Sequence, residues 1–137
     1  MSSLRKYLPD YVNIEKERPS LFVSCPREKI RELAMHFKQL KLKFITMTGE
    51  DLGDKLAVIY HFALYPSIHG ERGTINVKVY VPKDDPKVPT ISDLYVPALL
   101  YEREVWEMVG IVFEGHPRLE PLFLSSPDMP KFPLRKS

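Results

Sequence analysis

The chain has 137 residues, the common size of one domain, and its 20 lysines and arginines against 18 aspartates and glutamates give a formal net charge of only +2. This small excess excludes the broad positive field that drives binding to nucleic acid or to an anionic bilayer. The single cysteine, Cys25, excludes an internal disulfide and leaves too few thiolates for a cysteine-ligated zinc site or an iron–sulfur cluster.

The start of the chain lacks the apolar core of a signal peptide, and the apolar stretch 56–65 is about half of the ~20 residues that a membrane helix needs. We therefore expect a cytoplasmic protein that spans no membrane and is held at any membrane by other subunits. Thirteen prolines and a charged fraction of 28% suggest a thermophilic source, because loop proline and surface ion pairs are enriched in thermophile proteins.

The first half of the chain contains signals for a strand, a helix and a second strand. Residues 21–23 read as a short strand, and a helix can begin at Pro26. The helix is amphipathic, because its apolar residues follow the i, i+3, i+4, i+7 spacing: Ile30, Leu33, Ala34, Phe37 and Leu40. Residues 44–48 are rich in β-branched and aromatic side chains and predict a strand that ends at Gly49.

The middle of the chain predicts a hairpin. Residues 56–64 are apolar on both faces, which is typical of a central strand, and 75–81 alternate as a strand with one buried face should. A turn over 66–73 joins them, so we expect an antiparallel pair. The following segment, 83–89, predicts a rigid connector without ladder hydrogen bonds, since proline lacks the donor.

A second helix should begin near Pro97 and end at Gly110, and 111–113 should form a short edge strand. These elements predict an α+β fold: a mixed, mostly antiparallel sheet of four to five strands with two main helices on one face. We expect one α+β domain over 1–120 and an extended, proline-rich C-terminal tail over 121–137 that docks on a partner subunit.

Glu102 falls within the apolar arc of the second helix. On a helical wheel this arc and its flanks comprise Ala98, Leu99, Tyr101, Val105, Trp106, Met108 and Val109. A carboxylate among apolar groups must find hydrogen-bond donors or a cation, since leaving it unpaired would cost several kcal/mol. We favour capping or pairing of Glu102 within its own domain; fixing the helix against a partner subunit is the alternative.

The opposite side of this helix carries Arg103, Glu104 and Glu107, which fit either a solvated face with an Arg103–Glu107 ion pair or a protein interface. His116, in the turn before Pro117, is expected to make a structural hydrogen bond. An enzymatic alternative would join Glu104, Glu107 and His116 as metal ligands, but the Glu-x-x-His pairs of carboxylate-bridged sites do not occur. With no phosphate loop or nucleophile elbow either, we predict no catalytic residues.

Residues 101–117, with the sequence YEREVWEMVGIVFEGHP, closely resemble the hallmark segment of the 30 kDa or C subunit family of NADH-quinone oxidoreductase. Further resemblance in 81–86, 92–94 and 133–136 extends it over most of the chain. The resemblance implies a hydrophilic subunit without a cofactor, peripheral at the cytoplasmic face of the cell membrane. Its partners would be a large catalytic (49 kDa-like) subunit, with a quinone cavity or a nickel–iron site, and a small iron–sulfur subunit; these neighbours would carry the cofactors.

Carried over position by position, the resemblance implies structural and interface roles, and no catalytic or metal-binding ones. The residues concerned are Glu102, Arg103, Glu104, Trp106, Glu107, Gly110, Gly115, His116, Pro117, Pro133, Leu134, Arg135 and Lys136. They would order the helix, the turn after it and the contact with the partner.

Four positions depart from the usual family pattern: Glu107 replaces an aspartate, Val109 an aromatic residue, Arg118 an acid and Glu120 a base. Because charge order at an interface selects partners, the last two argue against a large subunit of the ordinary respiratory type. The chain looks more like its counterparts in the ferredoxin-linked, ion-translocating hydrogenases and sulfur reductases of archaea. The same role in an NADH- or F420H2-quinone oxidoreductase is the alternative.

Overall fold

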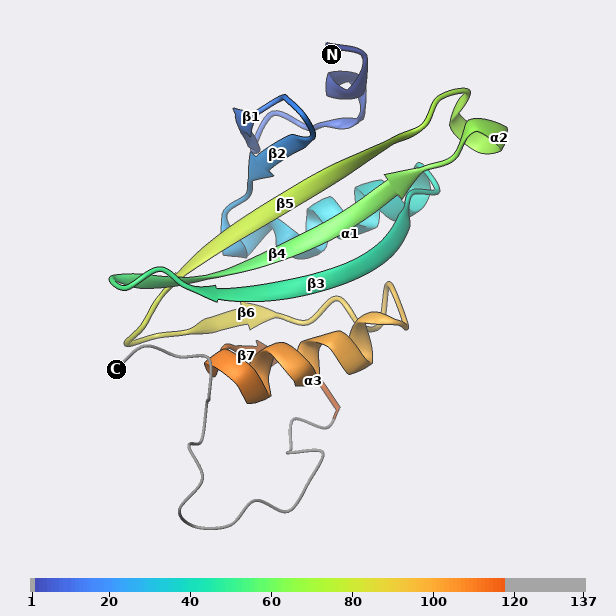
Figure 1. The fold of residues 1–137 in the computed structure, drawn as a ribbon. Coiled ribbons are helices and arrows are strands. Elements are labelled where there is room, and N and C mark those ends of the chain that lie inside the picture. The colour runs from blue at the N-terminus through green and yellow to red at the C-terminus, as the bar shows by residue number, and fades with distance from the viewer. Residues whose placement is uncertain (1, 118–137) are drawn as a thin grey trace.

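A computed structural model of the chain describes residues 2–117 (Figure 1). They form a five-stranded sheet, a two-stranded ribbon and two long helices. In chain order the elements are η1 (Ser2–Tyr7), β1 (Asn13–Lys16), β2 (Leu21–Ser24), η2 (Arg27–Lys29), α1 (Ile30–Gln39), β3 (Lys43–Asp51), β4 (Lys55–Leu64), α2 (Pro66–His69), β5 (Gly73–Pro82), β6 (Lys87–Pro89), α3 (Ala98–Val109) and β7 (Val112–Glu114).

The five strands lie in the order β1-β2-β5-β4-β3. Only β2 and β5 pair in parallel, while the other neighbouring strands are antiparallel. The predicted fold class, a mixed and mostly antiparallel sheet, is confirmed. The sequence does not predict β1, because this strand has four mostly exposed residues and one apolar side chain, that of Ile14.

β4 and β5 form the predicted antiparallel hairpin, in register from Lys55 opposite Pro82 to Leu64 opposite Gly73. β4 also pairs with β3, so it is flanked on both edges, and its residues 56–60 are all buried. The continuous apolar run therefore reflects a strand that has neighbours on both sides, as predicted.

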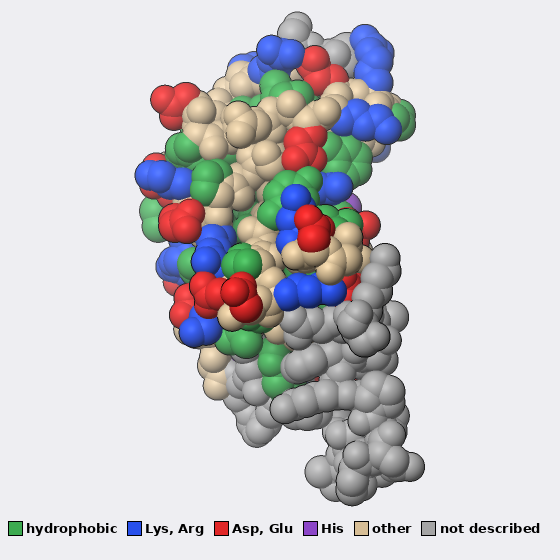
Figure 2. Space-filling model, turned by 90° about the vertical axis from the view of Figure 1, so that its left-hand side faces the viewer, with side chains coloured by type: hydrophobic (Ala, Val, Ile, Leu, Met, Phe, Trp, Pro, Cys, Tyr) green, Lys and Arg blue, Asp and Glu red, His purple; other side chains and the backbone are tan. Residues whose placement is uncertain are grey.

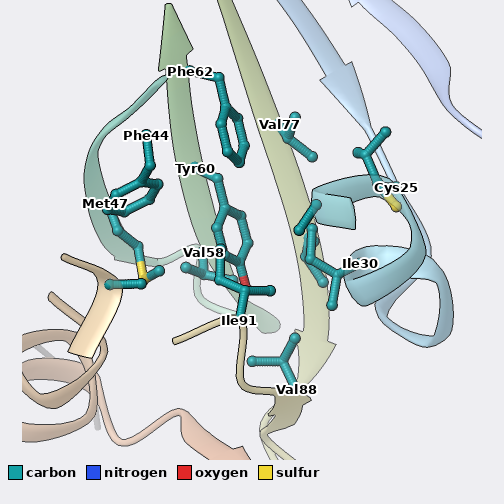
Figure 3. Packing of buried hydrophobic residues seen from close by; sticks show 14 of the residues in the cluster. Cys25, Ile30, Phe44, Met47, Val58, Tyr60, Phe62, Val77, Val88 and Ile91 are labelled. Atoms are coloured by element: carbon teal, nitrogen blue, oxygen red, sulfur yellow. The ribbon is translucent and has the colours of Figure 1, made fainter. Parts of the chain in front are cut away.

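Both long helices pack on one face of the sheet, which confirms that prediction. The ring of Phe62 in β4 contacts Phe37 of α1, with centroids 5.0 Å apart, and Phe44 of β3, at 5.8 Å. Phe44 in turn contacts Tyr101 of α3 at 5.8 Å. Figure 3 shows Phe44, Tyr60 and Phe62 within this shared core.

Local signals define both helices well. α1 buries four residues of the predicted stripe, which are each 0% exposed: Ile30, Leu33, Ala34 and Phe37. The fifth, Leu40, lies at the C-cap just after the helix and is half-buried. α3 follows Pro97 and ends at Gly110, whose φ of 84° lies in the left-handed region that a glycine adopts without strain. The proline and glycine signals therefore predict the ends of α3 correctly.

Gly49 does not end β3, contrary to the prediction; the strand continues to Asp51. An added Cβ at Gly49 would lie 2.9 Å from Val105 Cγ1 and 2.9 Å from Val109 Cγ2 of α3. The glycine is therefore explained by the close approach of a helix to the strand and not by a turn.

The segment 83–89 was predicted to hold no ladder, and this is wrong for its last three residues. They form β6, which pairs in parallel with β7. The amide of Val112 donates to the carbonyl of Pro86 at 2.7 Å, and the amide of Thr90 donates to the carbonyl of Glu114 at 2.8 Å. The first bond uses the carbonyl of a proline, and the second uses the amide of the residue after Pro89. Neither bond needs the N–H group that proline lacks, so the ribbon tolerates Pro89.

None of the helices within residues 2–117 is long and apolar enough to cross a membrane. On the side of the molecule seen in Figure 2, acidic and basic side chains are interspersed, in keeping with the small net charge. The domain boundary at 120 and the extended tail over 121–137 lie outside the described residues.

Candidate functional site

The carboxylate of Glu102 lies at the centre of a buried polar cluster between α3 and the segment that precedes it. Glu102 is 0% exposed. Its Oε1 accepts a hydrogen bond of 2.5 Å from the Thr90 hydroxyl, and its Oε2 accepts one of 2.9 Å from the amide of Ile91. Glu102 therefore finds its donors inside its own domain, as the preferred interpretation of the sequence requires.

Two hydroxyls extend the cluster away from Glu102. Thr90 Oγ1 and Ser92 Oγ lie 2.8 Å apart, and either atom can be the donor. The amide of Ser92 also donates to Thr90 Oγ1, at 3.0 Å. Residues 90–92 thus wrap around the carboxylate, and their hydrogen bonds hold the segment between β6 and α3 in one conformation.

Burial raises the pKa of Glu102 to about 7, the dominant effect on this group. The hydrogen bonds from Thr90 and Ile91 and the charge of Arg31 lower the pKa, while the charge of Asp93 raises it. The hydrogen bonds therefore offset only part of the cost of burying the ionised carboxylate, and near neutral pH both protonation states are populated.

Arg31 of α1 connects the cluster to the other helix. Its guanidinium donates from Nη1 to Asp93 Oδ1 at 2.7 Å and from Nη2 to Asp93 Oδ2 at 2.8 Å. Nη1 also donates to the carbonyl of Thr90 at 2.6 Å. Both side chains of the ion pair are partly exposed, so this pair contributes more to the position of the segment than to overall stability.

Tyr60 of β4 lies beneath the cluster in the core and is 0% exposed. Within the described residues its hydroxyl has no hydrogen-bond partner. Burial, and then the charge of Glu102, raise the pKa of Tyr60 well above its ordinary value, so the phenol keeps its proton.

The outer side of α3 differs from the prediction at one residue. Met108, placed by the helical wheel within the buried arc, is 40% exposed, because the sheet reaches the helix nearer Val105 and Val109. Glu104 and Met108 line a groove of about 370 Å³ between α3 and β3. Leu100, on the same side of the helix, is 50% exposed.

Arg103, Trp106 and Glu107 are half-buried, whereas Glu104 is exposed as predicted. The Arg103–Glu107 ion pair stays a prediction. Glu104 is therefore accessible to water or to a partner, and the solvated face and the protein interface both stay predictions for this side of the helix.

The turn after α3 packs back against the start of that helix. His116 Nε2 lies 2.8 Å from the carbonyl of Leu99, to which it donates. Gly115 has a φ of 88°, and a Cβ there would lie 3.1 Å from Thr90 Cγ2. His116 thus makes the structural hydrogen bond that the sequence predicts, and Gly115 and Pro117 lie beside the Glu102 cluster.

Among residues 2–117, no three side chains of His, Cys, Asp or Glu are grouped as they would be to hold a metal ion. His116 contacts Leu99 in the first turn of α3, and Gly115 lies against Thr90 of the Glu102 cluster. Glu104 lies apart from them on the groove. The remaining predicted residues lie outside the described part of the chain: Pro133, Leu134, Arg135 and Lys136.

The sequence signals do not point to the groups around Glu102, namely Thr90, Ser92 and Arg31. The resemblance at 92–94 was a signal that this segment matters. The two hydroxyl residues Thr90 and Ser92 before the second helix were another signal, because a Thr or Ser hydroxyl can donate a hydrogen bond to a buried carboxylate.

Comparison with known proteins finds similar chains in several oxidoreductases. The NADH-quinone oxidoreductase subunit 5 of Thermus thermophilus is 37% identical over 126 residues, which cover 85% of this chain and 60% of that protein. The membrane-bound hydrogenase subunit beta of Pyrococcus furiosus is 34% identical over 126 residues, which cover 86% of this chain and 69% of that protein. The chain thus spans about 60% of the length of its Thermus relative.

The fold also matches a chain in the solved structure of the membrane-bound sulfane sulfur reductase, an archaeal respiratory membrane complex. The TM-score is 0.82 at 26% identity, and the match covers 96% of this chain and 81% of that one. Residues 23–137 match the family model of the 30 kDa subunit of respiratory-chain NADH dehydrogenase. Because this match covers most of the sequence, the chain belongs to the family of the 30 kDa subunit of respiratory-chain NADH dehydrogenase.

Proposed function

We propose that the chain is a structural subunit without a cofactor in the hydrophilic arm of a membrane-bound, ion-translocating oxidoreductase. In this proposal it docks on the large catalytic subunit, next to the small iron–sulfur subunit, at the cytoplasmic face of the membrane. Electron transfer and catalysis belong to those neighbours, which carry the iron–sulfur clusters and any nickel–iron site.

The observation that carries the proposal is the way the family's hallmark segment is used in the fold. Glu102 is fully buried and accepts hydrogen bonds from Thr90 and Ile91, while His116 donates to the carbonyl of Leu99. These side chains order α3 and the segments on either side of it. They are directed at their own chain, which favours a structural role over a catalytic one.

The outer side of α3 supports the docking part of the proposal. Leu100 and Met108 are 50% and 40% exposed and lie eight residues apart, about two helical turns, so they share one side of α3. Val96, which is 67% exposed, lies in the turn just before the helix. Large apolar side chains that gather on one exposed surface often mark a protein interface. The same side carries Glu104, which would select a partner with a basic group at that place.

We infer that the complex is a ferredoxin-linked hydrogenase or a sulfur reductase from a thermophilic archaeon. The hydrogenase relative, the sulfane sulfur reductase match and the departures from the respiratory charge pattern at Arg118 and Glu120 favour this. The alternative, the same role in an NADH- or F420H2-quinone oxidoreductase, is supported by the Thermus relative, which is 37% identical.

The decisive experiment is a pull-down of the tagged chain from its source membranes in mild detergent, followed by metal analysis. We expect a large complex. Nickel together with iron would support a hydrogenase, and iron without nickel would support a sulfur or quinone enzyme. Recovery of the chain as a lone monomer under conditions that keep other membrane complexes intact would overturn the subunit role.

A second measurement tests the absence of a cofactor in this chain. We expect the purified chain to have no visible absorption and no stoichiometric metal, since its one cysteine is buried and donates its S–H to the carbonyl of Pro26. Retention of iron, nickel or flavin at one equivalent per chain would contradict the proposal.

A further inference from the structure

Three oxygen atoms form a continuous path from the buried carboxylate to a cavity at the surface. Glu102 Oε1 lies 2.5 Å from Thr90 Oγ1, which lies 2.8 Å from Ser92 Oγ. Glu102 is 0% exposed, whereas Thr90 and Ser92 are slightly exposed, at 7% and 6%. Both hydroxyl residues line a cavity of about 590 Å³ whose rim includes the exposed residues Asp93 and Glu114.

The hydroxyls satisfy the carboxylate in both of its protonation states without movement of any heavy atom. When Glu102 is ionised, the Thr90 hydroxyl donates to Glu102 Oε1 and the Ser92 hydroxyl donates to Thr90 Oγ1. When Glu102 is protonated, its O–H donates to Thr90 Oγ1, the Thr90 hydroxyl donates to Ser92 Oγ, and the Ser92 hydroxyl donates to water in the cavity. The amide of Ile91 remains on Oε2 in both states.

We propose that Glu102 is a proton-binding site that exchanges its proton with water in this cavity through the hydroxyls of Thr90 and Ser92. On uptake, a hydronium ion gives a proton to Ser92 Oγ, the proton of Ser92 passes to Thr90 Oγ1, and the proton of Thr90 passes to Glu102 Oε1. One O–H bond forms and one breaks at each hydroxyl, so that the net change is one proton moved from water to the carboxylate. No electron is transferred.

The groups around Glu102 bring the free energies of its ionised and protonated forms close together. Arg31 of α1 favours the ionised form, Asp93 of the preceding segment opposes it, and burial opposes it most. Tyr60 of β4 interacts with Glu102 but keeps its own proton. Burial raises the pKa of the carboxyl to about 7, so the site gains and loses its proton near neutral pH.

This inference goes beyond the proposed structural role, because it concerns the chain itself and holds whichever complex contains it. Nuclear magnetic resonance of the full chain, with ¹³C at the glutamate Cδ atoms, follows the proton directly. Glu102→Gln identifies the Glu102 signal by its loss. In the wild type we expect that signal to titrate between pH 6 and 8, near the pKa of about 7, with rapid exchange between its two forms.

Ser92→Ala is the decisive variant, because Ser92 does not contact the carboxylate. Removing its hydroxyl interrupts the path, and the loss of one hydrogen bond from a transfer route corresponds to about a tenfold slower exchange. Ser67→Ala, at an exposed serine of α2, is the matched control and should leave the exchange rate unchanged. Thr90→Val should slow exchange as well, and Thr90→Ser, which keeps the hydroxyl, should restore it.

Two results would overturn the proposal. One is an exchange rate in folded Ser92→Ala equal to that of Ser67→Ala, since the proton would then use another route. The other is a Glu102 signal that does not titrate between pH 5 and 9. Neither result affects the proposed subunit role, which the pull-down tests separately.

Discussion

Gly49 of β3 lies so close to Val105 of α3 that a Cβ on the glycine would be 2.9 Å from Val105 Cγ1. The second neighbour, Val109 Cγ2, is at the same distance, so the space on this side of the strand is filled by two branched side chains with little freedom. The short distance between β3, an edge strand of the sheet, and α3 is therefore possible because Gly49 has no side chain.

We expect Gly49→Ala to lower the free energy of unfolding by about 1–3 kcal/mol, the usual cost of overpacking a core. Urea unfolding of the purified chain measures it. In a Val105→Ala background, which removes one of the two close contacts, the same substitution should cost less. An equal cost in both backgrounds would show that the penalty does not come from the approach of α3.

Glu102→Ala should destabilise the chain by about 3 kcal/mol, because the Thr90 hydroxyl and the Ile91 amide would lose a shared acceptor in the core. Glu102→Gln should cost clearly less, because its carbonyl can accept from Ile91 and its amide can donate to Thr90 Oγ1. Unfolding at pH 6 compares the two variants. A loss below about 0.5 kcal/mol for Glu102→Ala, the range of surface substitutions, would contradict this account.

The stability of the chain should decrease with pH because of Glu102. Burial raises its pKa in the folded chain to about 7, from an ordinary value of 4.5. The folded state therefore binds more protons than the unfolded state in this window. The resulting stabilisation is fully present below pH 4.5 and is lost as the pH rises through about 7, a change of about 3 kcal/mol by linkage.

To measure this pH effect, the free energy of unfolding is compared between the wild type and Glu102→Gln at each pH. The contributions of groups that titrate in both proteins cancel in the difference. We expect the wild type to lose about 2 kcal/mol or more relative to the variant between pH 5 and pH 8. Parallel pH profiles for the two proteins would contradict the raised pKa.

Removal of the residues after Leu124 should leave the melting temperature of the isolated chain almost unchanged and weaken its association with the large subunit. The physical reason lies in the sequence: prolines at 121, 127, 130 and 133 prevent a regular helix or central strand, and proline limits the entropy lost on docking. The apolar side chains between them need cover: Leu122, Phe123, Leu124, Met129, Phe132 and Leu134. A large fall in melting temperature with association intact would favour a tail packed on its own domain.

The features that the sequence predicts correctly depend on neighbouring residues. The 3.6-residue period defines the buried stripe of α1, and strict alternation defines β5. Pro97 and Gly110 mark the ends of α3, because one favours the first turn and the other adopts the left-handed conformation at the cap. The family hallmark at 101–117 is likewise a contiguous signal, and it identified the family that the comparison supports.

The sequence by itself thus determined the long helices, the hairpin, the family and the need of Glu102 for donors. Only the tertiary structure decided which donors these are, since Thr90 and Ile91 meet the carboxylate through the path of the chain between β6 and α3. It also decided the parallel pairing of β6 with β7 and the exposure of Met108. These depend on contacts between segments that approach only after folding, and local propensity and periodicity carry no information about such contacts.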